Sequence, residues 1–180
     1  LTIVVLLTGL LHVDWLDVRR STRGFARLSE AHDRLETGDL NGAIELLTSI
    51  SDDGSVSAPE VYTSLVRARI SRNAPGDAQA VLETAEAGLR HHPGDPELLW
   101  YASAGRVSLR DWEAASRHLS NYLAQRPDDP RALFMAAASA YEQGDLVSAD
   151  TWLTRAEALD GSNPLVLGLR QQLASAASQE

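Results

Sequence analysis

The sequence contains no cysteine, which excludes disulfides, thiolate metal sites, iron–sulfur clusters and cysteine nucleophiles. It also contains no lysine: all 16 basic residues are arginines, so neither a Schiff-base lysine nor a phosphate-loop lysine is present. Hydrophobic residues nevertheless make up 44% of the 180 residues. This composition excludes a disordered chain and is typical of one compact unit or one short repeat array.

Positive charge is also scarce over most of the chain. Of the formal net charge of −9, residues 1–27 contribute +2 (4 Arg, 2 Asp), while residues 28–180 contribute −11 (12 Arg, 23 acids). Nucleic-acid affinity comes largely from clustered basic side chains that displace counterions from phosphates. An acidic body therefore predicts no nucleic-acid partner.

The amino-terminal segment is uncharged over residues 1–13. Thirteen helical residues span about 20 Å, less than the roughly 30 Å of bilayer hydrocarbon, but Trp15, Leu16 and Val18 extend the apolar run toward a full span. We therefore expect an apolar helix that anchors residues 1–20 in a membrane, with a buried first helix or the end of a signal peptide as the alternatives. The anchoring residues of this prediction are Ile3, Val4, Leu6, Leu7, Leu10, Leu11, Trp15, Arg19 and Arg20.

Four arginines follow the apolar segment, at positions 19, 20, 23 and 27. We expect the stretch Arg19–Arg27 to contact anionic lipid headgroups. By the positive-inside tendency this arrangement favours a single pass through a bacterial inner membrane with residues 21–180 in the cytoplasm. A periplasmic location of residues 21–180 is the alternative.

The rest of the chain repeats with a period of 34 residues. Pro93 and Pro127 are 34 residues apart, and Pro96, Pro130 and Pro164 keep the same step twice. Turn-like pairs that end in aspartate recur at positions 38–39, 76–77, 110–111 and 144–145. This spacing predicts a tandem array of one repeated structural unit.

Each repeat has the features of a pair of helices. In Asp95–Pro96, Asp129–Pro130 and Asn163–Pro164 an Asx side chain can cap a helix whose first residue is proline. Small and large apolar residues then recur at helical spacing until the turn-like pair, after which a second helix follows. Residues 24–51, 59–93, 96–125 and 130–159 each predict such a pair, with an uncertain register near residues 72–76. Residues 164–178 predict a final unpaired helix, in which Leu165, Leu169 and Leu173 cover the last repeat.

This set of residues resembles the tetratricopeptide repeat family over most of residues 24–164. Two sequence blocks match its consensus of small and large residues: Leu99, Ser103, Ala115, Leu119 and Pro127, and Ala137, Gly144, Ala149, Leu153 and Ala156. Arg106 and Tyr122 depart from it, since the family has a large apolar residue and alanine at these places. The resemblance implies an all-α solenoid of about four antiparallel helix pairs with a C-terminal cap helix, whose first helices line a groove that binds proteins or peptides.

The sequence contains no recognisable catalytic constellation. No HExxH motif occurs, no two histidines stand three or four residues apart, and no glycine-rich loop follows a strand. Glycines at 38, 76 and 144 are typical of turns between helices. We therefore expect no enzyme activity, no metal and no cofactor.

Within the frame of the family, Trp100 and Phe134 each follow a packing leucine by one residue, which turns them about 100 degrees toward the groove. Tyr141, Arg67 and Arg131 lie nearby in that frame, and aromatic residues with arginine are typical of binding hot spots. We predict that these five residues bind the partner. The alternative is that both aromatic rings only pack between helices.

Taken together, these patterns predict a non-catalytic scaffold or assembly factor, tethered to a membrane complex, with a subunit of that complex as its protein partner. Two alternatives are a periplasmic chaperone-like module for envelope, pilus or cytochrome maturation, and a permanent structural subunit of a larger membrane complex.

Overall fold

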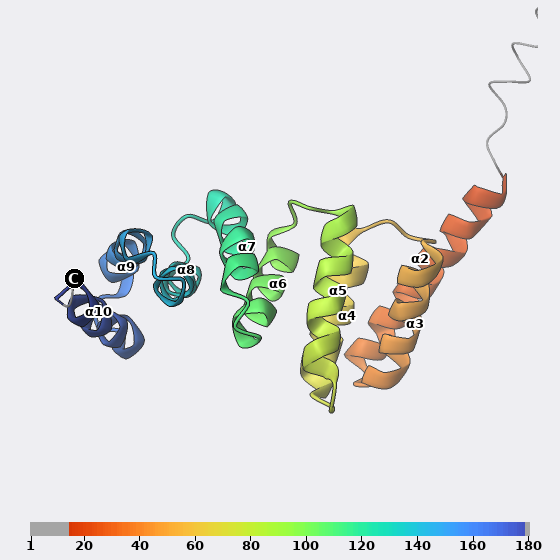
Figure 1. Ribbon diagram of the computed structural model, residues 1–180. Coiled ribbons are helices and arrows are strands. Elements are labelled where there is room, and N and C mark those ends of the chain that lie inside the picture. The colour runs from red at the N-terminus through yellow and green to blue at the C-terminus, as the bar shows by residue number, and fades with distance from the viewer. Residues whose placement is uncertain (1–14, 179–180) are drawn as a thin grey trace, which may run out of the picture. The chain divides into compact units, whose positions relative to one another are not determined.

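The computed structural model describes residues 15–178, and every element in this range is an α-helix. The helices are labelled α2 to α10 in Figure 1. The chain divides into two compact units, residues 1–74 and residues 75–180. The division falls in the predicted elbow near residues 72–76, so the predicted helix pair of residues 59–93 is shared between the two units.

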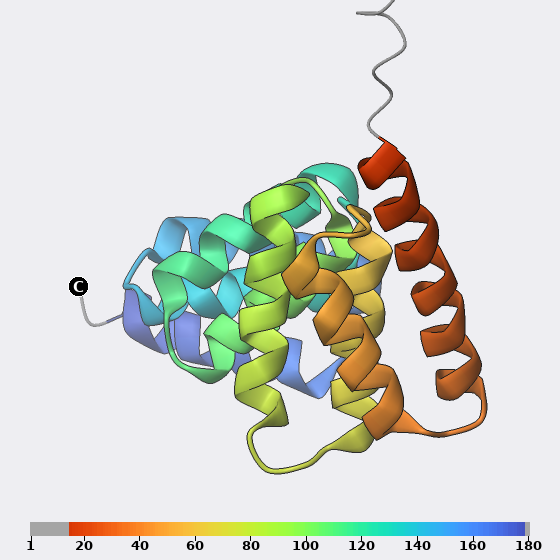
Figure 2. The same ribbon diagram turned by 90° about the vertical axis from the view of Figure 1, so that its right-hand side faces the viewer.

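The first unit contains three described helices, α2 (Trp15–Glu36), α3 (Leu40–Asp53) and α4 (Pro59–Arg72). Helix α3 packs against both α2 and α4, and the three lie side by side in Figure 2. Their shared core contains Ala31, Ala43, Leu47 and Val61, each fully shielded from solvent. Helix α2 continues without a break through residue 20, where the sequence analysis places the end of the anchor, and that boundary stays a prediction.

Most of the predicted membrane anchor lies outside the described residues. Trp15 begins α2, and Arg19 and Arg20 belong to the same helix. Ile3, Val4, Leu6, Leu7, Leu10 and Leu11 precede the described range. Among the helices of residues 15–178, none combines the length and the apolar character needed to cross a bilayer.

Of the arginines predicted to meet lipid headgroups, Arg27 has a partner within the protein. Its guanidinium lies 2.6 Å from the Asp53 carboxylate and also contacts the Ser49 hydroxyl. Burial opposes ionisation of Asp53, but hydrogen bonds from Ser55 and Arg27 lower the pKa of Asp53 to about 2. The pair joins α2 to the end of α3.

The second unit contains six helices, each packed against the next along the chain. They are α5 (Asp77–His91), α6 (Pro96–Ser108), α7 (Trp112–Gln125), α8 (Pro130–Glu142), α9 (Leu146–Asp160) and α10 (Pro164–Ala177). Helix α6 also contacts α8, and α8 contacts α10, so these three first helices form one row. The predicted pairs at residues 96–125 and 130–159 and the final helix are confirmed.

The predicted helix caps are present. The side chains of Asp95, Asp129 and Asn163 accept hydrogen bonds from the opening turns of α6, α8 and α10, each of which begins with proline. Asp111 and Asp145 cap the second helices α7 and α9 in the same way. Because five consecutive helix starts obey one rule, the 34-residue period fixes their positions along the chain.

Two turns depart from this rule. At Gly76–Asp77 the glycine is the cap, and Asp77 is instead a buried first residue of α5. At Arg110 the backbone has φ of 58°, the left-handed conformation that Gly38 and Gly144 adopt at the equivalent turns. An arginine therefore occupies a position where glycine is the favoured residue.

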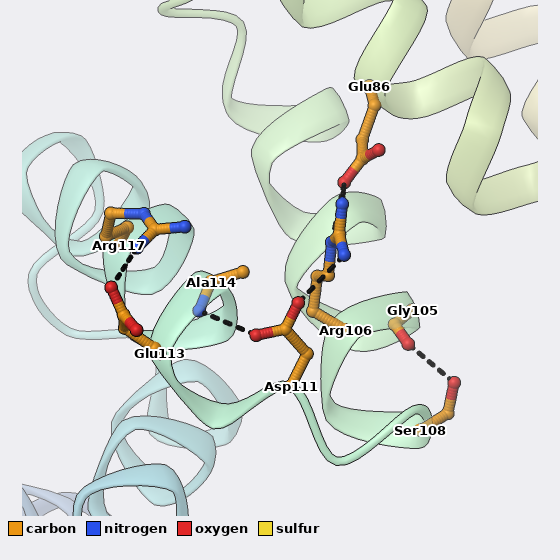
Figure 3. A network of polar contacts seen from close by, with 8 residues as sticks. All are labelled: Glu86, Gly105, Arg106, Ser108, Asp111, Glu113, Ala114 and Arg117. Carbon is orange, nitrogen blue, oxygen red and sulfur yellow. Dashed lines mark hydrogen bonds and ion pairs between the residues drawn. The ribbon is translucent and has the colours of Figure 1, made fainter.

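Arg106 replaces the large apolar residue of the family pattern with an ionic link between three helices (Figure 3). Its Nε donates to Glu86 of α5 at 2.7 Å, and its Nη1 donates to Asp111, the cap of α7, at 2.8 Å. Hydrogen bonding to Glu86 raises the pKa of Arg106. Nearby, burial lowers the pKa of the His118 imidazole. The departure at Arg106 therefore joins α5, α6 and α7 by charge.

The cap helix α10 covers the preceding repeat with a different set of residues from the predicted one. Leu169 and Leu173 are buried as expected, but Leu165 is 64% exposed and Val166 is buried instead. A uniform spacing of four residues drifts around a helix by about 40 degrees per step, whereas the spacing of three and then four from Val166 stays on one face. Arg170 fixes α10 on α9 by hydrogen bonds to both carboxylate oxygens of Glu157.

Candidate partner-binding site

The row of first helices in the second unit presents one continuous face. Because α6, α8 and α10 begin at prolines 34 residues apart, residues that share a repeat position lie side by side. Positions separated by three, four and three residues fall on one side of a helix, opposite the buried side. We call this surface the first-helix face: Glu97, Trp100, Ala104 and Val107 of α6, Arg131, Phe134, Ala138 and Tyr141 of α8, and Leu165, Gly168, Gln172 and Ser175 of α10.

Two of the predicted binding residues meet at the centre of this face. The Arg131 guanidinium lies over the Trp100 ring, 4.7 Å from the ring centroid. On its other neighbouring helix, α7, Tyr122 contacts Trp100 at a centroid distance of 5.8 Å with the rings tilted by 45°. Trp100 is half-buried, and the Arg131 side chain is 72% exposed. The ring is therefore held in place from two sides while its cationic neighbour is open to solvent.

A buried hydrogen bond fixes the position of Tyr122. Its hydroxyl donates to Oδ2 of Asp129 at 2.8 Å, while Oδ1 of Asp129 accepts from the backbone amides of Arg131 and Ala132. Burial and this hydrogen bond both raise the pKa of Tyr122. Burial alone opposes ionisation of Asp129, but its hydrogen bonds lower the pKa of this carboxyl. The carboxylate thus stays ionised while it orients both α8 and Tyr122.

Phe134 and Tyr141 extend the face along α8. Both rings are half-buried and pack against the core of the second unit, so part of each ring serves packing and part remains accessible. Both the binding role and the packing alternative of the sequence analysis are compatible with half-burial. The role of Phe134 and Tyr141 in binding stays a prediction.

A recess of about 490 Å³ opens between α8 and α10. Tyr141 forms one wall, and the other lining residues are Gly168, Gln171, Gln172, Ser175 and Ala176. Gly168 occupies the repeat position that Trp100 and Phe134 occupy one and two repeats earlier. The row of aromatic rings therefore ends at a glycine, and the space that a third ring would fill is open.

Arg67 belongs to the first unit and is separate from the other predicted residues. It lies with His32, Glu60 and Ser64 around a hollow of about 630 Å³ lined by α2, α3 and α4. The His32 Nε2 atom lies 3.2 Å from the Ser64 hydroxyl and 3.8 Å from the Glu60 carboxylate. A serine–histidine–acid relay needs the acid on the other ring nitrogen. Since both contacts use Nε2, this cluster lacks the geometry of such a relay.

The sequence analysis missed Tyr122, Leu165, Gly168 and Gln172. Tyr122 was noted only as a departure from the family pattern, and Leu165 was expected in the core. The signal that finds the others is the 34-residue step itself, since adding it to Phe134 and Ala138 gives Gly168 and Gln172. Among the described residues, no group of histidine, aspartate and glutamate side chains has the arrangement of a metal site.

Comparisons with known proteins agree with this architecture. The family model of the tetratricopeptide repeat matches residues 105–164, which run from α6 to the start of α10. No curated protein sequence matches the chain significantly. Several solved structures match it at low sequence identity.

One such structure is a mutant of the protein MamA, with a TM-score of 0.71 and 15% identity over 87% of this chain and 89% of that chain. A MamA structure from Desulfovibrio magneticus RS-1 has a TM-score of 0.66 and 16% identity over 87% and 89% of the two chains. A tetratricopeptide repeat protein from Parabacteroides merdae has a TM-score of 0.68 and 15% identity over 87% of this chain and 60% of its own. The chain thus has the fold of these helical repeat proteins, and its residues 105–164 belong to the tetratricopeptide repeat family.

Proposed function

We propose that this protein is a non-catalytic scaffold or assembly factor that binds a segment of a partner protein on the first-helix face. The observation that carries the proposal is the stack of Arg131 over Trp100, held from behind by Tyr122. Tryptophan and arginine are the residue types most enriched in binding hot spots, and pre-ordered side chains lose little entropy on binding.

Exposed apolar surface on the same face supports the proposal. Leu165 is 64% exposed and stands at the repeat position of Arg131, next to the open end of the aromatic row. A cation, two aromatic rings and an exposed leucine on neighbouring helices form a surface that contacts both apolar and acidic groups of a partner. The neutral and anionic parts of one peptide segment would thus find matching contacts.

The experiment compares two matched variants, Leu165→Asp and Val147→Asp. Both leucine and valine are exposed and occupy the second residue of a helix, α10 or α9, where an aspartate is favourable to the helix. Only Leu165 lies on the first-helix face. Wild-type protein, both variants and Arg131→Glu are used as bait in detergent extracts of the native host.

We expect one stoichiometric partner to bind wild type and Val147→Asp, and to be lost with Leu165→Asp and Arg131→Glu. Equal recovery of that partner by all four proteins contradicts the proposal, because binding would then occur elsewhere. Wild-type protein that leaves the extract alone and monodisperse contradicts it as well. Thermal unfolding of each variant shows whether the fold survives the substitution.

We also propose that residues 1–20 tether the protein to a bacterial inner membrane, with the soluble part in the cytoplasm. The support is the uncharged stretch of residues 1–13 and the arginines at 19, 20 and 23. Deletion of residues 1–13 should move the protein from the membrane fraction to the soluble fraction. Reporters fused after residue 180 should be active only in the cytoplasm, and periplasmic activity contradicts the proposed side.

A further inference from the structure

We propose that the recess at Gly168 is a specificity pocket that takes one tyrosine or tryptophan side chain of the bound partner segment. This inference rests on the proposed function, because it names the chemistry that the first-helix face selects. The pocket lies at the end of the aromatic row, between α8 and α10.

The absence of a side chain at Gly168 creates the pocket. A methyl group built on Gly168 would have no neighbouring atom within 4 Å, so the space above this residue is open. At the equivalent positions of the two preceding repeats, Trp100 and Phe134 fill the surface with their own rings. The partner would therefore supply the third ring of the row.

The lining selects an uncharged guest. None of the six lining residues carries a charged side chain. A carboxylate or ammonium group that entered the pocket would lose hydration without gaining an opposite charge, which is costly. Charged side chains of the partner therefore remain on the open part of the face, beside Arg131.

Polar groups at the rim favour a ring that has a hydrogen-bonding atom. The side chains of Tyr141, Gln171 and Gln172 make no hydrogen bond with any other described residue. Tyr141 and the glycine floor offer apolar contact, while the two amides offer donors and acceptors. Tyrosine and tryptophan combine a large apolar ring with one polar atom, and thus match both parts of the lining.

The length of the partner segment follows from the helix row. Neighbouring packed helices lie about 10 Å apart, so a segment that contacts both Trp100 on α6 and the pocket on α10 spans about 20 Å. An extended chain covers this distance with about six residues. A probe of twelve residues is long enough to contact all three helices.

The test uses a phage-displayed library of random 12-residue peptides, selected on the full-length wild-type protein. Enriched peptides are synthesised, and their dissociation constants are measured against wild type, Gly168→Ala and Gly168→Phe. We expect the enriched peptides to share one tyrosine or tryptophan whose replacement by alanine weakens binding at least about tenfold. Gly168→Phe, which fills the pocket, should weaken binding by a similar factor, whereas Gly168→Ala should change it less than about threefold.

A second blocking variant guards against a folding defect. Ser175→Phe fills the pocket from another lining position, and should weaken binding as Gly168→Phe does. Peptides that lose affinity with Leu165→Asp but bind both phenylalanine variants like wild type overturn the pocket and leave the proposed function standing. Peptides that bind every first-helix-face variant like wild type, or a library that enriches no peptide, overturn the proposed function and the pocket with it.

Discussion

The Tyr122 hydroxyl donates a hydrogen bond of 2.8 Å to the Asp129 carboxylate, which caps α8. One contact therefore joins the end of one helix pair to the start of the next. The same tyrosine ring packs against Trp100, so the contact also fixes a predicted binding residue. At Tyr122 the family pattern has alanine, and the larger side chain serves the link between repeats.

Tyr122→Phe removes this hydrogen bond and keeps the ring. We expect the free energy of unfolding to fall by about 1 kcal/mol, since the buried carboxylate loses one donor. Urea denaturation measures the change as a lower midpoint at unchanged slope. Tyr141→Phe is the control: its hydroxyl has no partner among the described residues, so its midpoint should not move. Equal shifts for the two variants would show that the Tyr122 contact contributes nothing.

Leu153→Ala tests the core of the second unit. Leu153 of α9 is fully buried among residues of α7, α8 and α10, so its truncation should lower the free energy of unfolding by about 2 to 5 kcal/mol. Val147→Ala on the same helix changes a side chain that is 80% exposed, and should cost less than about 0.5 kcal/mol. The two costs would be similar only if the helix were rotated relative to the structure described above.

Glu157→Gln tests the ionic attachment of the cap helix. Hydrogen bonds from Arg170 lower the pKa of Glu157 below its ordinary value of 4.5, so the stabilisation is present above that pH and is lost as the pH falls through the lowered pKa. We expect the variant to be about 1 kcal/mol less stable than wild type at pH 7, and the difference to shrink below pH 4.5.

The control for this prediction is Glu113→Gln. Glu113 pairs with Arg117 on the surface of a single helix, and both side chains are mostly exposed. Its replacement should change stability little at either pH. A stability difference for Glu157→Gln that persists unchanged in acid would contradict the role of its charge.

Gly168→Ala tests the open space above the pocket floor independently of any ligand. An alanine in the interior of α10 has higher helix propensity and meets no atom within 4 Å, so stability should rise by up to about 1 kcal/mol. The matched variant is Gly105→Ala in α6, where the added methyl would lie 3.0 Å from Leu82. Crowding should cancel the gain there. A loss of stability at Gly168 would mean that the position is already filled.

Local chemistry predicted the helix starts of the second unit. The Asx–Pro pairs at residues 95, 129 and 163 determine both a cap and a first residue, so each start followed from two adjacent amino acids. The turn at Arg110 was located by its period although its arginine is unusual for a left-handed backbone. Signals of this kind act within a few residues and are visible in a sequence.

Contacts between distant residues were not predictable in the same way. The pairing of Arg106 with Glu86 depends on the register of α5, which a longer elbow obscured. The burial of Val166 in place of Leu165 depends on how α10 rotates on α9, and a leucine repeat with a spacing of four suggests the wrong face. The pocket at Gly168 arises from a missing side chain, so its signal exists only by comparison with the preceding repeats.

The measurement that tests the central claim most directly is a titration of the isotope-labelled full-length protein with the tightest library peptide, followed by nuclear magnetic resonance. We expect chemical-shift changes at backbone amides of α6, α8 and α10 and at the Trp100 indole N–H, with the indole signals of Trp112 and Trp152 on α7 and α9 unchanged. Changes centred on α7 and α9, with an unmoved Trp100 signal, would contradict binding on the first-helix face.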